Sequence, residues 1–171
     1  MEMIFTTERT YVRRLQTSDY DSYHDLRGNP NVMNPLPKQA LNEEETAKEL
    51  QLFISLERSE GKRVWCLCEK DTNEMIGCCV ILKNEKDQDE IGYQLREKFW
   101  GFGYGSEIAQ GLINHAFKAL NSELITADVS VENSKSIKIL EKFLLLEKEF
   151  FNTRDNCMDR RYSLKKELWK Y

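Results

Sequence analysis

The chain has 171 residues, of which 40% are apolar, 32% charged and 11% aromatic, with 8 Gly and 3 Pro. The length suits one domain of about 100–200 residues, and the composition excludes a disordered or collagen-like chain. The 25 Lys and Arg residues stand against 29 Asp and Glu residues, a formal charge of −4. Such a balance argues against a basic face for nucleic acid. We therefore expect a single domain, residues 1–171, with no nucleic-acid partner.

The hydropathy pattern argues against a membrane or secreted protein. The longest apolar run, residues 76–82, is strand-sized and far below the roughly 18 residues of a membrane span. Residues 1–9 lack the basic-then-apolar layout of a secretory signal. We expect a cytoplasmic protein with no membrane partner.

The cysteines support the same compartment. Five occur, at positions 66, 68, 78, 79 and 157, with no C-x-x-C pair and no nearby His. A zinc site is poorly supported, and we expect no metal. We interpret the thiols as small core side chains in a reducing compartment, with disulfides or a reactive thiol as the lesser alternative.

The first part of the chain predicts one strand and one helix. Residues 9–15 carry β-branched and aromatic side chains, which favour a strand. Thr17 or Ser18 then caps a helix that runs through Arg27 and stops at the Gly-Asn-Pro of residues 28–30.

A loop and a second helix follow. Residues 31–41 contain two prolines and several polar residues, which indicates a loop. Asn42 is an N-cap with an acid three residues on, and the apolar spacing beyond it predicts a helix to about Glu60. Gly61 is expected to end this helix.

The middle of the chain changes to strands. Residues 64–69, 75–83 and 90–96 are β-rich runs with short polar connections, which predicts an antiparallel meander. A helix that begins near Tyr104 with one apolar side leads into a strand at residues 124–131. This strand–helix–strand unit predicts a parallel pair inside a sheet that is otherwise antiparallel.

The last part predicts a helix at residues 134–143 and two closing strands at residues 149–152 and 160–164. The chain is therefore an α+β protein with a mixed, mostly antiparallel sheet.

Residues 95–107 pass from a strand through alternating glycines into a helix N-terminus, an arrangement that binds anions. Gly101, Gly103 and Gly105 can take positive φ and leave no Cβ between backbone and ligand, so N–H groups can converge on phosphate oxygens. The helix adds its unpaired first-turn N–H groups. A tight turn without a ligand is the alternative.

Spacing separates this loop from two other phosphate-binding motifs. A Rossmann fingerprint needs G-x-G-x-x-G, whereas the sixth position from Gly101 is Ser106. A Walker loop ends in Gly-Lys-Ser/Thr, and that triplet is absent.

The loop resembles the pyrophosphate loop of the GNAT superfamily of acetyl-CoA-dependent N-acetyltransferases, whose pattern is Gln/Arg-x-x-Gly-x-Gly/Ala. Here residues 100–105 read Trp-Gly-Phe-Gly-Tyr-Gly, and a Trp at the first position is common in the ribosomal-protein alanine acetyltransferase branch. Residues 90–95 and the opening strand, residues 8–15, are similar to that branch. Residues 128–143, which carry Asn-x-x-Ser and then Glu-Lys, are also similar to that branch.

The resemblance implies the GNAT fold, a twisted, mostly antiparallel sheet of about seven strands flanked by about four helices. It also implies acetyl-CoA as cofactor. The cofactor-binding positions that it implies are Leu95, Gly101, Phe102, Gly103, Tyr104, Gly105, Ser106 and Asn133. The strand that ends at Leu95 would splay from its parallel neighbour and leave backbone groups for the pantetheine amides.

The resemblance also suggests catalytic residues. Ser136 is the candidate proton donor for the thiolate, while Asn133 or Ser134 as a simple helix cap is a compatible alternative. Glu90 and Asp128 are candidate bases, directly or through water, and a solvated acid or an ion pair is the alternative for each. Tyr93 is interpreted as a packing residue.

Two positions depart from the family pattern. Leu144-Leu145 replaces the usual Gly-Phe, and Leu cannot comfortably take the left-handed conformation that Gly would supply. Many relatives carry a tyrosine acid where this chain has Leu140, so no tyrosine acid is assigned there.

The expected activity is direct attack of a primary amine, on a protein N-terminus or a small molecule, on acetyl-CoA in a ternary complex. The acceptor is expected between the first two helices, the loop of residues 29–41 and the C-terminal strands, with no charge preference. A monomer or homodimer is expected. The alternative is a partner-binding domain that keeps the acyl-CoA loop without catalysis.

Overall fold

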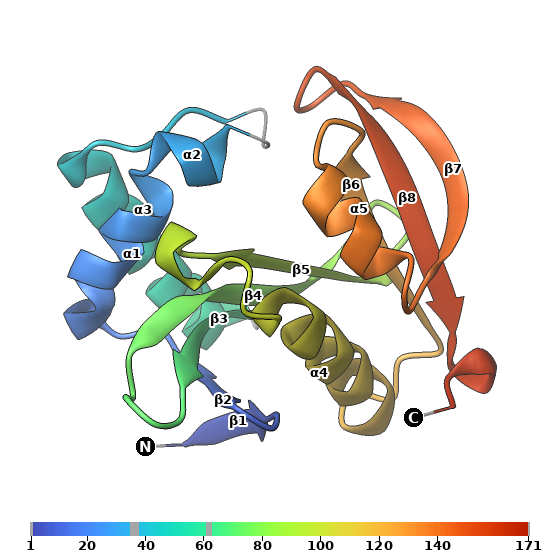
Figure 1. Ribbon diagram of the computed structural model, residues 1–171, viewed down its shortest axis with the longest axis horizontal. Helices are drawn as coiled ribbons and strands as arrows, with labels where there is room; N and C mark the ends of the chain where they lie inside the picture. The colour runs from blue at the N-terminus through green and yellow to red at the C-terminus, as the bar shows by residue number, and fades with distance from the viewer. Residues whose placement is uncertain (1, 35–37, 61–62, 171) are drawn as a thin grey trace.

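A computed structural model of the chain describes residues 2–34, 38–60 and 63–170. Its centre is a twisted eight-stranded sheet in the order β1-β2-β3-β4-β5-β6-β8-β7 (Figure 1). The strands are β1 (Met3–Thr6), β2 (Thr10–Arg14), β3 (Arg63–Glu69), β4 (Met75–Lys83), β5 (Asp89–Leu95), β6 (Leu124–Ser130), β7 (Leu145–Asn152) and β8 (Cys157–Lys165). The α-helices are α1 (Tyr20–Arg27), α2 (Pro30–Met33), α3 (Glu43–Glu60), α4 (Tyr104–Lys118) and α5 (Ser134–Leu140). The 3₁₀ turns are η1 (Thr17–Asp19), η2 (Glu97–Phe99) and η3 (Lys166–Leu168).

The predicted strand pairing is confirmed. β3, β4 and β5 form the antiparallel meander, and β5 and β6 form the parallel pair. That parallel pair has only two registered positions, Asp89 opposite Ile125 and Glu90 opposite Thr126. Beyond Glu90 the two strands diverge, so the rest of β5, to Leu95, runs along an opening in the sheet. β5 therefore splays away from β6, as expected.

Helices cover both faces of the sheet. The core on the α4 face includes Ile108 and Leu112 with Trp65 and Ile91. The core on the other face joins α1 and α3 to the strands through residues such as Leu26. In Figure 1, α1, α2 and α3 lie on one side of the opening, and β6, β7, β8 and α5 lie on the other. No helix among the described residues is long and apolar enough to cross a membrane.

Four of the five cysteines are core residues, as predicted, whereas Cys157 on β8 is only partly buried and belongs to neither core. Cys66, Cys68 and Cys78 belong to the core on the α1–α3 face, and Cys79 belongs to the α4 core, because successive strand residues point to opposite faces. All five thiols are free.

Two predictions in the N-terminal half need correction. The sheet has eight strands, because β1, a four-residue strand, pairs antiparallel with β2. The predicted loop 31–41 contains most of a short helix, α2, which starts at Pro30 and is capped by Asn29 through a 2.9 Å bond from the Asn31 N–H. Residues 35–37 of that loop, and Gly61, lie outside the described residues.

The turn at Leu144-Leu145 forms without a left-handed residue. The described non-glycine residues with positive φ are Asn73, Asp87, Asn121 and Asn156. α5 ends at Leu140, three residues earlier than predicted, and Leu144 is 3% exposed in the α4 core. Burial of the Leu side chain anchors the connection that the family usually makes with Gly.

Candidate active site

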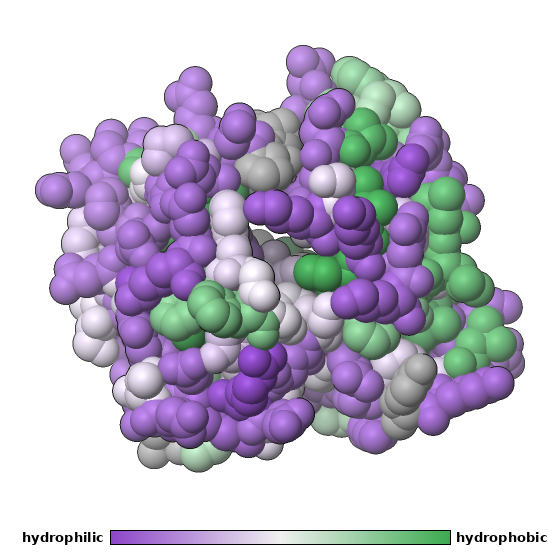
Figure 2. Space-filling model, viewed as in Figure 1, coloured by the Kyte–Doolittle hydropathy of each residue, from purple (hydrophilic) through white to green (hydrophobic). Residues whose placement is uncertain are grey.

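A cavity of about 1420 Å³ lies between the two halves of the molecule, and Figure 2 shows a hollow near the centre of this face. Its volume exceeds the roughly 300–1,000 Å³ that is usual for a single small-molecule site. Predicted site residues that line it are Leu95, Gly101, Gly103, Tyr104, Gly105, Ser106, Asn133 and Ser136. Phe102, Glu90 and Asp128 are not among its described lining residues, and Phe102 is 64% exposed on the surface.

The glycine loop presents open backbone donors to this cavity. Gly101 and Gly103 both have φ of +85°, which is the left-handed region that glycine adopts at little cost. Gly103 is the N-cap of α4. Because glycine has no side chain that could cap the helix, first-turn N–H groups of α4 stay available to an anion.

Gly105 lines the cavity but does not have the positive φ that the sequence allowed. It lies inside α4 and is not among the positive-φ glycines. A Cβ at this position would stand 2.8 Å from Cδ1 of Ile139, a residue of α5. Gly105 therefore lets α4 and α5 approach each other.

Arg9, which the sequence did not single out, holds the loop from outside. Its Nε donates to Glu107 at 2.7 Å, its Nη1 donates to the Phe102 carbonyl at 2.9 Å, and its guanidinium lies 4.4 Å from the centre of the Tyr104 ring. Glu107 is an acid in the first turn of α4, where its charge would repel a phosphate, and Arg9 neutralises it.

Trp100 occupies the first position of the loop and ties it to β5. Its indole N–H donates to the Leu95 carbonyl at 2.9 Å, and the Lys135 ammonium lies 4.5 Å from the ring centre. Lys135 and Lys138 on α5 both line the cavity, and they put two cations near the anion-binding loop. Lys142 donates to the Ser106 hydroxyl at 2.9 Å.

The start of α5 brings two hydroxyl groups together at the cavity. Asn133 caps the helix by accepting from the Ser136 N–H at 3.1 Å, as the cap alternative predicted. Ser136 faces Tyr93 on β5. The Tyr93 hydroxyl is buried and has no hydrogen-bond partner of ordinary geometry among the described residues. Burial raises the pKa of Tyr93, and the Ser136 hydroxyl offsets part of that rise.

The two faces of β5 carry different chemistry. Tyr93 and Leu95 pack against the α4 core. Glu90 and Gln94 point to the opposite face, where the Gln94 side-chain oxygen accepts from Arg27 Nη1 at 3.1 Å. Arg27 in turn makes two bonds to Glu49, at 2.7 and 3.1 Å.

Glu90 has the most perturbed pKa among the candidate acids. Burial and, to a smaller extent, the charge of Asp128 raise its pKa, the charge of Arg161 offsets part of that rise, and the resulting pKa is about 7. A carboxyl with a pKa near neutral pH is suited to accept and release protons there.

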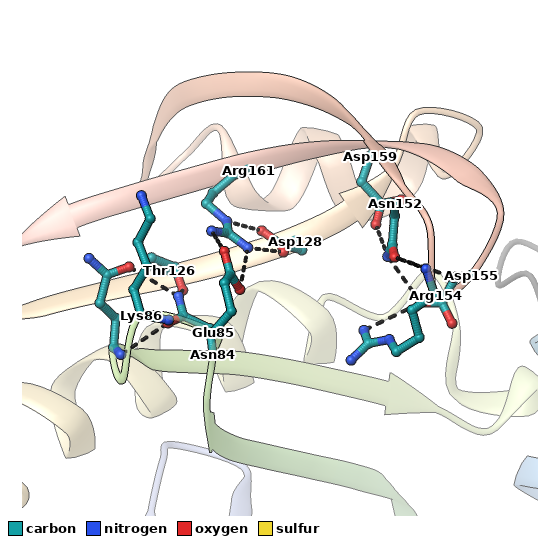
Figure 3. A network of polar contacts seen from close by, with 11 residues as sticks. Asn84, Glu85, Lys86, Thr126, Asp128, Asn152, Arg154, Asp155, Asp159 and Arg161 are labelled. Atoms are coloured by element: carbon teal, nitrogen blue, oxygen red, sulfur yellow. Dashed lines mark hydrogen bonds and ion pairs between the residues drawn. The ribbon is translucent and has the colours of Figure 1, made fainter.

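Asp128 is held in an ion pair, the alternative considered for it (Figure 3). Arg161 donates to its two carboxylate oxygens at 2.7 and 2.6 Å and is itself 2% exposed. Arg161 also pairs with Glu85 and lowers the pKa of that acid to about 2. Arg161 therefore occupies both carboxylate oxygens of Asp128 with charge-assisted bonds, and this geometry separates Asp128 from Glu90.

Comparison with known proteins decides the family. Residues 9–143 match the family model described as "Acetyltransferase (GNAT) domain". The chain belongs to the GNAT acetyltransferase family. It is 33% identical over 145 residues, 82% of this chain and 80% of its relative, to a protein called uncharacterized N-acetyltransferase p20 from Bacillus licheniformis.

Solved GNAT structures have the same fold. An acetyltransferase of the GNAT family from Bacillus anthracis matches with a TM-score of 0.84 and 23% identity, over 97% of this chain and 99% of that one. RimL, named as the ribosomal L7/L12 alpha-N-protein acetyltransferase in complex with coenzyme A, matches with a TM-score of 0.78 and 23% identity, over 96% and 98% of the two chains.

GNAT enzymes use acetyl-CoA, and the cavity of this chain fits that molecule. The open N-terminus of α4 and the left-handed Gly101 and Gly103 suit a diphosphate. Lys135 and Lys138 supply positive charge beside it. Beyond Glu90, β5 has no registered partner in β6. Its backbone groups there can bind the amides of the extended pantetheine arm.

One GNAT feature is replaced here. Leu140, where many relatives have a tyrosine acid, is 4% exposed and packs in the α4 core. The cavity has the Tyr93 and Ser136 hydroxyls instead. Tyr93 packs against the α4 core, as predicted, and its place in the cavity lining has no local signal in the sequence of a strand.

Proposed function

We propose that the protein transfers the acetyl group of acetyl-CoA to a primary amine in a ternary complex, with Glu90 as base and the Ser136–Tyr93 pair as proton source. The observation that carries this proposal is the opening between β5 and β6, which has the ionisable Glu90 at its narrow end and, further along β5, the buried Tyr93 hydroxyl beside Ser136. Acetyl-CoA supplies the acetyl group as an activated thioester.

Glu90 has the properties of the base. Its pKa of about 7 leaves a substantial fraction ionised at neutral pH, so its carboxylate can take a proton from the amine, directly or through water. It lies on the last registered pair of β5 and β6, where the opening begins.

Ser136 and Tyr93 have the properties of the proton source. When the amine nitrogen forms its bond to the acetyl carbon, the carbon–sulfur bond breaks and sulfur keeps the electron pair. A hydroxyl beside that sulfur supplies a proton or a hydrogen bond, and a tyrosine is the stronger acid of the two. Tyr93 takes a proton back from solvent through Ser136, and Glu90 releases the amine proton to solvent. The overall products are an amide and a free thiol.

The non-catalytic alternative has no support from the comparisons, in which the named relatives are acetyltransferases. The grounds for that alternative are the apolar Leu140 and the absence of a Gly-Phe turn at Leu144-Leu145, whereas Tyr93 offers a hydroxyl from another strand. We place the protein in the ribosomal-protein alanine acetyltransferase branch. We also infer that it works in the cytoplasm, in keeping with its five free thiols.

The test combines calorimetric titration of the protein with acetyl-CoA and measurement of thiol release with a panel of amines. We expect one site and amine-dependent release of free coenzyme A. Tight binding with no release for any N-terminal peptide, alkylamine, polyamine or aminoglycoside would favour the non-catalytic alternative. Failure to bind acetyl-CoA would contradict both functions.

A further inference from the structure

One side of the cavity is lined by apolar side chains. On the Glu90 face of the sheet, α2, α3 and β4 contribute apolar side chains to the cavity lining, and we name this set the apolar wall. Its members are Val32, Phe53, Leu56, Val80 and Leu82. Four of them, all but Val32, are only half-buried, so their side chains present apolar surface to the cavity.

The strand register places the apolar wall beside Glu90. Leu82 lies directly opposite Glu90 in the β4–β5 pair, and Val80 lies opposite Gly92. A Cβ at Gly92 would stand 3.0 Å from Cγ2 of Val80, so any larger residue there would fill the space between the strand and the wall. An amine at Glu90 thus has an apolar channel for its substituent.

The charges around the wall disfavour a second ammonium group. Among the described lining residues the one acid is Glu132, which lies next to α5 on the other side of the cavity. The charged lining residues on α1 and before α3 are Arg27, which is paired with Glu49, and Lys38. A polycation would place an unpaired charge against apolar side chains and near these cations, which is unfavourable.

We propose that the acceptor is a primary amine with a single positive charge and an apolar substituent, which docks on the apolar wall. This proposal rests on the proposed acetyl transfer and names its substrate class. An N-terminus with an apolar first side chain and a small apolar monoamine share this chemistry. A polyamine and an aminoglycoside do not.

The test is thiol release with saturating acetyl-CoA and a matched series of amines: ethylamine, butylamine, hexylamine and spermidine. Each buried methylene favours binding about fourfold, so we expect kcat/KM to rise from ethylamine to hexylamine by at least tenfold. Spermidine carries additional charges along a longer chain, and we expect it to be at least tenfold poorer than hexylamine. Thiol release with peptides that begin with Leu or with Asp then distinguishes a protein N-terminus from a small monoamine as the acceptor.

Phe53→Asp tests the wall itself, because it adds a carboxylate to it. We expect the hexylamine-to-spermidine preference to fall at least tenfold. Leu52→Asp is the matched control, since Leu52 is the neighbouring residue of α3, is 52% exposed and is not a described lining residue. It should leave the preference unchanged. Circular dichroism of both variants verifies folding.

This proposal would be overturned, while acetyl transfer itself stands, by any one of three results. These are equal kcat/KM values for all the alkylamines, a preference for spermidine, or an unchanged hexylamine-to-spermidine preference in Phe53→Asp. Absence of thiol release with every amine would overturn the proposed function and this proposal together. The two failures are therefore distinguishable in one assay.

Discussion

The cofactor half and the acceptor half of the cavity are built in different ways. The cofactor half uses backbone groups from one continuous segment, Gly101 to Ser106, and the start of the next helix, α5. The proposed acceptor half uses side chains from separate segments, with Leu82 on β4 and Phe53 on α3 in the lining and Glu90 on β5 opposite Leu82.

The difference shows which half tolerates change. A backbone site depends on conformation, so only a few positions with special φ or close contact are restricted. A side-chain site depends on identity at each position, so substitution there alters rate and preference while acetyl-CoA binding persists. The two halves can therefore be distinguished by whether a substitution changes the affinity for acetyl-CoA or the turnover.

The largest effect is expected for Glu90→Gln, which keeps the shape of the side chain and removes its basicity. Loss of a general base lowers kcat by about 10²–10⁴-fold. Acetyl-CoA affinity should stay within about threefold in calorimetry, because Glu90 is not a described lining residue of the cofactor half. A variant with normal kcat would show that Glu90 is not the base.

Gly103→Asp should affect the other half. It forces a non-glycine residue into φ of +85° and puts a negative charge at the N-terminus of α4. We expect at least a ~10²-fold loss of acetyl-CoA affinity by calorimetry. Gly103→Ala is the control that carries the strain without the charge, and it should lose less. Equal affinities for wild type and Gly103→Asp would refute the anion site.

Tyr93→Phe should lower kcat by about 10–100-fold with little change in the KM for acetyl-CoA, because it removes a proton donor while keeping the ring. Tyr11→Phe is a matched control: Tyr11 is buried, donates to Asn73 at 3.2 Å and does not line the cavity. If both variants keep full kcat, Tyr93 has only a packing role, and Ser136→Ala then tests the remaining hydroxyl.

Asp128→Asn should have the smallest effect, a change in pH dependence. The Asp128 charge raises the pKa of Glu90 and the Arg161 charge lowers it, so the variant should lower that pKa. The acidic limb of the rate profile then moves to lower pH, and relative activity at pH 6 rises about 3–10-fold. Complete loss of the high-pH plateau in a folded variant would instead make Asp128 the base.

The conformation of the glycine loop and the cap of α5 can be predicted from the sequence because their signals are local. Positive φ at Gly101 and Gly103 and the cap at Asn133 follow from residues within a few positions of each other. The role of Gly105 does not, because its neighbour Ile139 lies on another helix. Arg9 is likewise almost a hundred residues from Glu107 in the chain.

The acceptor half is harder to predict because strand acids look alike in sequence. Glu90 and Asp128 differ only in what surrounds them, a half-buried position for one and a buried Arg161 for the other. The sequence also does not predict strand β1, because four residues are too few to show the alternation of apolar and polar side chains in a strand. The connection at Leu144 forms through burial, which a turn rule does not consider.

The pH dependence of kcat/KM for hexylamine, measured in parallel for wild type and Glu90→Gln, tests the central claim most directly. Because burial raises the pKa of Glu90 to about 7, wild-type activity should rise as pH increases through about 7. In Glu90→Gln that limb should vanish, leaving only the higher limb from ionisation of the amine itself. An unchanged limb near pH 7 in the variant would contradict the account.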